Sequence, residues 1–226
     1  MGRKRSYSHE VREDESVYGS SSATVVDMPA ELLDVGVEFM KELKKKAQAA
    51  SHALKKAGVS HAVIGGLALG AHLAKAHPLA ERNTQDMDIL LNRDDLERAK
   101  AALAPLGYRF RKVMRLSVFM PNRRGAHFVE GIHVIWASEK VRPEYPHPAP
   151  HLTSGARTQG HDGICYLSLP ALVTMKLTSF RHKDITHIQD LLFWKVIDKR
   201  TEKALPADLR KRLRQVKRET QREYPG

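Results

Sequence analysis

Cysteine is nearly absent from this sequence. Its 226 residues include a single cysteine, Cys165, which excludes an internal disulfide and any zinc site built from several cysteines. We expect Cys165 to be a small buried residue. Long apolar runs are also missing: no stretch approaches the roughly 20 residues needed to span a bilayer, and the N-terminus lacks an apolar signal core. We therefore expect a cytoplasmic protein with no membrane partner.

Acidic residues are too few to balance the basic ones. The chain has 38 Lys and Arg against 26 Asp and Glu, which gives a formal net charge of +12 and a pI near 9.9. Much of the excess lies in residues 197–226. A basic surface favours a polyanionic partner such as RNA, although a run of charges is more often a solvated face.

The composition, 42% hydrophobic and 28% charged, is typical of a globular protein. The length allows one domain with an appended helical part, or two small domains. Residues 1–29 are polar and lack periodicity, which predicts a flexible N-terminal extension. We expect residues 30–167 to form an α/β core, and residues 168–226 to form a helical segment that ends in a basic tail.

The stretch from Ser60 to Leu91 organises the chain. It reads as a short strand, a glycine turn at Gly65 and Gly66, a helix, a loop and a second strand. Asp86 and Asp88 open that second strand and are separated by one residue, so their side chains are expected on the same face. Paired carboxylates suit Mg²⁺, and glycine N–H groups at a helix N-terminus suit a phosphate.

These residues carry a family resemblance. The pattern Gly65-Gly66-Leu67-Ala68-Leu69, followed by Arg82-Asn83-Thr84-Gln85-Asp86-Met87-Asp88, resembles the polymerase-beta-like nucleotidyltransferase superfamily. Within it, the sequence is most similar to small bacterial nucleotidyltransferase-like proteins related to abortive-infection toxins and minimal nucleotidyltransferases. The resemblance covers roughly residues 58–198. It implies an α+β fold, with a mixed sheet flanked by helices and a C-terminal helical part.

The remaining elements follow from periodicity and turn signals. An amphipathic helix is predicted over residues 30–57, with its lysines either on a solvated face or in contact with RNA, and a second helix over residues 94–106. The expected strands are residues 108–113, 116–120, 126–129, 132–137 and 164–167, and residues 138–163 form a connection with little regular structure. Residues 168–198 are either two helices or one kinked helix, and the tail is a basic helix.

The resemblance implies roles for further residues. It places Lys176 near phosphate, with a basic and acidic group formed by Arg181, Lys183 and Asp184 close behind. For this group, surface salt bridges are the alternative. The resemblance also implies that Arg82 and Thr84 either position phosphate or brace the loop.

A third carboxylate is missing from its expected strand. The full two-metal site of the superfamily uses one on a neighbouring strand, but Gly131–Trp136 has no Asp or Glu. His133 occupies that position, either as a general base or as a hydrogen-bonded strand residue. Glu130, Glu139 or Glu144 could substitute from a loop.

Two functions follow. The first is a Mg²⁺-dependent, or Mn²⁺-dependent, nucleotidyltransferase that moves a nucleoside monophosphate from a nucleoside triphosphate to a hydroxyl of an RNA, a protein or a small molecule, with a toxin-like role implied by the resemblance. Asp86, Asp88 and His133 would be catalytic, and both aspartates would hold the metal. The alternative is a catalytically degenerate nucleotide-binding or RNA-binding protein on the same fold. No partner protein is identifiable from the sequence.

Overall fold

A computed structural model describes residues 30–78, 80 and 84–223. The predicted N-terminal extension, residues 1–29, lies outside the described residues, and so does Arg82. No helix in the described ranges is long and apolar enough to cross a membrane.

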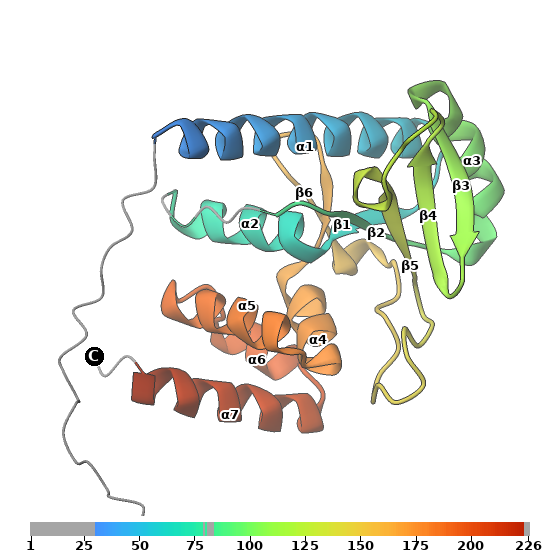
Figure 1. Ribbon diagram of the computed structural model, residues 1–226. Coiled ribbons are helices and arrows are strands. Elements are labelled where there is room, and N and C mark those ends of the chain that lie inside the picture. Colours follow the sequence, from blue (N-terminus) through green and yellow to red (C-terminus); the bar gives the residue numbers. More distant parts are fainter. Residues whose placement is uncertain (1–29, 79, 81–83, 224–226) are drawn as a thin grey trace, which may run out of the picture.

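One seven-stranded mixed sheet forms the centre of the fold (Figure 1), with the strand order β3-β4-β5-β2-β1-β7-β6. Two neighbouring pairs, β1 with β7 and β2 with β5, run parallel, and the other four pairs run antiparallel. The strands are β1 (His61–Ile64), β2 (Met87–Leu91), β3 (Tyr108–Val113), β4 (Leu116–Pro121), β5 (Ile132–Trp136), β6 (Arg157–Gln159) and β7 (Cys165–Leu167). The predicted α+β class with a mixed sheet is confirmed.

Seven α-helices are described around this sheet: α1 (Ala30–Lys56), α2 (Gly65–Ala76), α3 (Leu96–Leu103), α4 (Leu169–Ser179), α5 (His182–Phe193), α6 (Lys199–Ala204) and α7 (Ala207–Glu223). In Figure 1, α1 runs along the top of the view, the C-terminal helices α4 to α7 form the bottom, and α2 lies between them. Helix α2 packs on β1 and β2 and also on α4. The helix that begins with the glycine pair therefore joins the sheet to the C-terminal helices.

Helix α1 shows how the amphipathic pattern becomes a core. Its buried residues recur at helical spacing: Met40, Leu43, Ala47, Ala50 and Leu54. They pack into the same core as the fully buried residues of the sheet and of α3, so one continuous stripe attaches the helix to the domain. Gly58 ends this segment with φ +66°.

The strand predicted over residues 126–129 is wrong. The chain forms a 3₁₀ turn there, η3 (Phe128–Glu130), in which the N–H groups of Glu130 and Gly131 donate to His127 O and Phe128 O. The Glu130 carboxylate accepts from His127 N–H at 2.8 Å and caps the turn. This reciprocal capping favours a turn over a strand.

The connection over residues 138–163 is more regular than predicted. It contains the 3₁₀ turn η4 (Ser154–Ala156) and β6, which pairs antiparallel with β7. The last strand begins at Cys165, which is half-buried. Between α4 and α5, Phe180 adopts a left-handed conformation with φ +48°. Because this residue interrupts the helical path, the segment forms two helices.

Candidate active site

Asp86 and Asp88 line one cleft of about 910 Å³. Asp86 directly precedes β2, and Asp88 is its second residue, paired with Ile64 of β1 on one side and with His133 of β5 on the other. Met87, between the two aspartates, is fully buried, whereas both aspartates are partly exposed. This alternation presents both carboxylates to the cleft, the arrangement that the spacing predicted.

The glycine pair makes room for the loop that carries these carboxylates. Gly65 opens α2 with φ +70°, and a Cβ atom added there would lie closer than 3.0 Å to Asp88 Oδ2. A Cβ atom on Gly66 would collide in the same way with Thr84 Oγ1. Gly65 lines the cleft, whereas Thr84 packs against Gly66 and donates its backbone N–H to Met40 Sδ at 3.4 Å. The geometry of Thr84 favours bracing of the loop over contact with phosphate.

A buried polar cluster closes the opposite wall of the cleft. Lys176 of α4 is 5% exposed, and its Nζ lies 2.6 Å from His187 Nδ1 and 3.7 Å from Asp184 Oδ1. Asp184 is 2% exposed and accepts hydrogen bonds from Ser179 Oγ at 2.8 Å and Arg181 Nε at 2.7 Å. Asp184 is buried and so is not part of a fully exposed salt bridge, whereas Arg181 and Lys183, the other two residues of that alternative interpretation, are themselves exposed.

Burial sets the charge behaviour of this cluster. Desolvation lowers the pKa of Lys176 to about 8, against the opposing charge of Asp184. Burial alone would raise the pKa of Asp184, but hydrogen bonds from Arg181 and Ser179 and the charge of Lys176 outweigh it and hold that pKa below its usual range. Lys183 is exposed and lines the cleft. The wall therefore keeps a carboxylate ionised beside a lysine that changes charge near pH 8.

His133 lies beside Asp88. Its Nδ1 is 3.4 Å from Asp88 Oδ1, its Nε2 donates to Phe128 O at 3.1 Å, and its ring stacks on Phe128 with the centroids 4.6 Å apart. The contact with Asp88 raises the pKa of His133 above its ordinary value, although partial burial opposes the shift. The histidine is thus fixed in the sheet at the position where the superfamily pattern has a carboxylate.

The three glutamates considered as substitutes are engaged elsewhere. Glu130 pairs with Arg123, Glu139 accepts two hydrogen bonds of 2.6 Å from Arg93, and Glu144 lies 3.8 Å from Arg142. Over the described ranges, no group of three or more His, Cys, Asp or Glu side chains is arranged to hold a metal ion. The local carboxylate set is therefore the pair formed by Asp86 and Asp88.

Two basic or polar residues near the site, Lys46 and His187, have no site role predicted from the sequence. Lys46 of α1 turns inward and donates to Glu130 O and, at 3.3 Å, to Gly131 O; burial lowers its pKa to about 8, while the charges of Glu130 and Asp86 oppose that shift. His187 is the other, and its spacing of three residues from Asp184 on one helix face could have revealed it. The inward turn of Lys46 has no signal in the α1 sequence, where it follows two exposed lysines.

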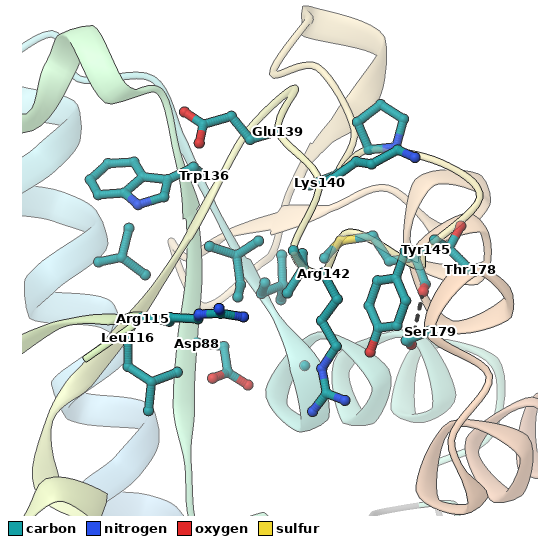
Figure 2. A pocket seen from close by; sticks show the side chains of 18 of the residues that line it. Asp88, Arg115, Leu116, Trp136, Glu139, Lys140, Arg142, Tyr145, Thr178 and Ser179 are labelled. Atoms are coloured by element: carbon teal, nitrogen blue, oxygen red, sulfur yellow. Dashed lines mark hydrogen bonds between the residues drawn. The ribbon is translucent and has the colours of Figure 1, made fainter. Parts of the chain in front are cut away.

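The cleft carries an excess of positive charge. Figure 2 shows Arg115 and Arg142 entering the space beside Asp88, the first from the turn between β3 and β4 and the second from the loop after β5. Its basic lining residues are Arg93, Lys112, Arg115, Lys140, Arg142, Lys176, Arg181 and Lys183, and its acidic ones are Asp86, Asp88, Glu139, Glu144 and Asp184. Eight cations against five carboxylates favour an anionic ligand.

Comparison with known structures gives a likeness at the level of the fold. An antigenic nucleotidyltransferase-like protein from Paracoccidioides brasiliensis has a TM-score of 0.50 and 15% sequence identity, with 82% of this chain and 89% of that chain covered. The antibiotic-resistance factor ANT(2'')-Ia has a TM-score of 0.46 and 14% identity over 79% and 92% of the two chains. The Megavirus polyadenylate synthase has a TM-score of 0.47 and 14% identity, over 88% of this chain and 41% of that one.

At the level of sequence, no curated protein matches the chain. A protein-family model described as uncharacterised nucleotidyltransferase matches residues 41–182, more than half of the chain. The matched range contains the glycine pair, both cleft aspartates, His133 and Lys176, and it confirms the resemblance to nucleotidyltransferases. It also supports nucleotidyl transfer with a nucleoside triphosphate as substrate. The chain therefore belongs to the family of uncharacterised nucleotidyltransferases.

Proposed function

We propose that this protein is a metal-dependent enzyme that transfers a nucleoside monophosphate from a nucleoside triphosphate to an acceptor hydroxyl. One observation carries the proposal: Asp86 and Asp88 share a cleft with the N-terminus of α2 at Gly65 and with buried Lys176. Carboxylate oxygens, free helix N–H groups and a lysine are the three kinds of group that a triphosphate with a bound divalent cation requires.

The residues present fit Mg²⁺, or Mn²⁺ in its place. Asp86 and Asp88 supply the hard oxygen ligands that these ions prefer, and the missing Cβ of Gly65 lets Asp88 Oδ2 lie close to the N-terminus of α2. The bound metal would neutralise charge on the phosphates and align the attacking and leaving oxygens. The absent third carboxylate leaves room in the ligand set for water and phosphate oxygens.

The protein side chains would then position the reactants. The N-terminus of α2 favours a phosphate group, and Lys176, Arg181 and Lys183 on the facing wall compensate its negative charge. The acceptor oxygen forms a bond to the α-phosphorus, the bond from that phosphorus to the bridging oxygen breaks, and pyrophosphate leaves with the electron pair. The hydroxyl proton is released to solvent or to a base. His133 is fixed between Asp88 and Phe128 O, which favours a positioning role over that of a general base.

The second candidate is a nucleotide-binding or RNA-binding protein without turnover, favoured by the absence of a third carboxylate near Asp86 and Asp88 among the described residues. The basic tail gives this alternative little support, because one of its cationic side chains binds to backbone carbonyl groups of α4 and not to solvent or a ligand. Arg212 of α7 donates to Leu177 O at 2.6 Å and to Thr178 O at 3.0 Å. A toxin-like role and a cytoplasmic location stay predictions.

Calorimetric titration of Mg²⁺ with each nucleoside triphosphate tests the proposal. We expect metal-dependent binding by the wild-type protein, its loss in the Asp86→Asn/Asp88→Asn double variant, and its retention in the matched variant Asp94→Asn, whose side chain is exposed outside the cleft. Transfer of α-phosphate label to a component of a cell extract would then separate the enzyme from the nucleotide-binding alternative. Absence of triphosphate binding by the folded wild-type protein would overturn the enzyme proposal and the nucleotide-binding form of the alternative.

A further inference from the structure

The hairpin formed by β3 and β4 carries a large charge of one sign. Between Glu97 and Glu130 the sequence contains eight Lys or Arg residues and no Asp or Glu. Four of them lie on β3 and the turn that follows it: Arg109, Arg111, Lys112 and Arg115, which we name the hairpin cations. All four are exposed, and none makes a side-chain hydrogen bond or ion pair with another residue in the described ranges.

The sheet register links these cations to the cleft. Arg111 pairs with Val118, Val118 with His133, and His133 with Asp88. Directly paired residues on neighbouring strands share a face of the sheet, so Arg111 lies on the same face as Asp88, three strand spacings or about 14 Å away. Arg109, two residues earlier on β3, shares that face. Lys112, on the other face of β3, and Arg115, in the turn after it, line the cleft itself.

The tip of the hairpin adds apolar surface to this charge. Met114 is 93% exposed with φ +54°, and Leu116 and Val113 are also exposed. Two aromatic side chains line the cleft with arginines over their rings: Trp136 lies under Arg93 at 4.3 Å, and Tyr145 under Arg142 at 5.9 Å. Cations combined with exposed apolar and aromatic side chains are the elements that bind a nucleic acid strand, through its phosphates and through its bases.

Protection of a sheet edge does not account for this pattern. Edge strands carry charges that prevent pairing with another chain. Either sign serves that purpose, but all the charged side chains of β3 are positive. A small phosphorylated acceptor is also a poor fit, because the hairpin cations span most of a six-residue strand, about 20 Å. A cationic acceptor would be repelled by them.

We propose that the acceptor is a single strand of RNA, bound along the β3–β4 hairpin, with the hydroxyl that receives the nucleotide placed near Asp88. This assignment rests on the proposed function of the cleft, and it names the substrate class of that site. The hairpin, and not the basic C-terminal helix α7, is the surface that binds the RNA.

The test compares two double variants of equal charge. Arg109→Gln/Arg111→Gln removes two exposed cations on the face of Asp88 that do not line the cleft. Lys211→Gln/Arg214→Gln removes two exposed cations from α7, which lies at the bottom of Figure 1, away from the hairpin at the upper right. Binding of a labelled mixed-sequence RNA of about 16 nucleotides is followed by fluorescence anisotropy over a range of salt concentrations.

Each lost phosphate contact on a single strand reduces the slope of log K against log[salt] by about 0.7, so two lost contacts weaken binding about 25-fold at about 0.1 M salt if the two proteins bind equally at about 1 M salt. We expect the hairpin variant to show this loss relative to wild type. The α7 variant should match wild type. Equal losses in both variants, an unchanged salt slope, or equally tight binding of poly(glutamate) would overturn the assignment. Calorimetric binding of the triphosphate is measured on the same samples. If it persists while RNA binding is absent, the RNA inference fails and the nucleotide site stands.

Discussion

Gly65→Ala should damage the cleft without unfolding the protein. Gly65 has φ +70°, a conformation that costs an L-residue about 1–2 kcal/mol. The new Cβ would also collide with Asp88 Oδ2, so the carboxylate would have to move by about 1 Å to reach ordinary contact. A displacement of that size at a catalytic group can cost about 100-fold in rate. We therefore expect a modest loss of stability together with a large loss of metal-dependent function.

Gly107→Ala provides the matched control. Gly107 has φ +81°, close to the value at Gly65, but nothing lies within 4 Å of the Cβ it would gain. Its backbone strain is therefore similar, and it produces no collision. Urea unfolding of both variants measures the shared cost of strain, and calorimetric titration with Mg²⁺ and nucleoside triphosphate measures the effect on the cleft.

The two variants should separate in the second assay. We expect Gly107→Ala to bind the metal and nucleotide like wild type, and Gly65→Ala to lose at least about tenfold in affinity, or about 1.4 kcal/mol. Wild-type affinity in a folded Gly65→Ala protein would refute the reasoning, because Asp88 could then move without consequence for the ligand. Equal losses of affinity in both variants would also refute it, since strain alone would then explain the result.

Three further predictions concern the buried cluster. Asp184→Asn should destabilise the fold by about 3–5 kcal/mol in urea unfolding, because it leaves buried Lys176 without its carboxylate partner; exposed Asp94→Asn is the control, and a loss below about 1 kcal/mol would contradict the role of Asp184. Nucleotide affinity should fall as the pH rises through about 8, because Lys176 loses its proton there. The titratable or charged groups around Lys176 are Asp184, His187, Arg181 and Lys183. Stability should move in the opposite direction, rising with pH between about 8 and 10.5, because the unfolded chain holds that proton more tightly. Calorimetry across this pH range checks both signs, and an affinity independent of pH would contradict the contact of Lys176 with phosphate.

Apolar periodicity and turn signals predicted the elements whose structure depends on residues near in sequence. Within the segment from Ser60 to Leu91, strand β1, helix α2 and strand β2 form as predicted, because the apolar periodicity changes at Gly65 and again before Asp86. The turn over Phe128–Glu130 was missed because two adjacent apolar residues suggest a strand, whereas the decisive contact is a side-chain cap from Glu130 to His127 N–H.

Tertiary contacts decided the parts of the candidate site that the sequence left open. Lys46 follows two exposed lysines on α1, but it reaches carbonyl groups 84 and 85 residues further along the chain and lies 5.8 Å from the ring of Tyr108. The sequence around Asp184 is compatible with either a surface or a buried carboxylate, because its burial depends on how α4 and α5 pack together. The spacing of Asp86 and Asp88 needed no such information, because strand geometry alone orients both.

The exchange of a carboxylate for His133 has a consequence for how the metal would bind. Two aspartates without a third acidic neighbour hold a divalent cation with less negative charge. When the His133 ring carries a proton on both nitrogens, its Nδ1 donates toward Asp88 and competes with the metal for that carboxylate. Phosphate oxygens of a nucleoside triphosphate would then supply the charge that the protein lacks. We expect the metal and the nucleotide to bind as a coupled pair, with each raising the affinity for the other by the same factor. In this arrangement the cleft would hold its metal when the substrate is present. When no metal or substrate is bound, His133 would keep Asp88 oriented.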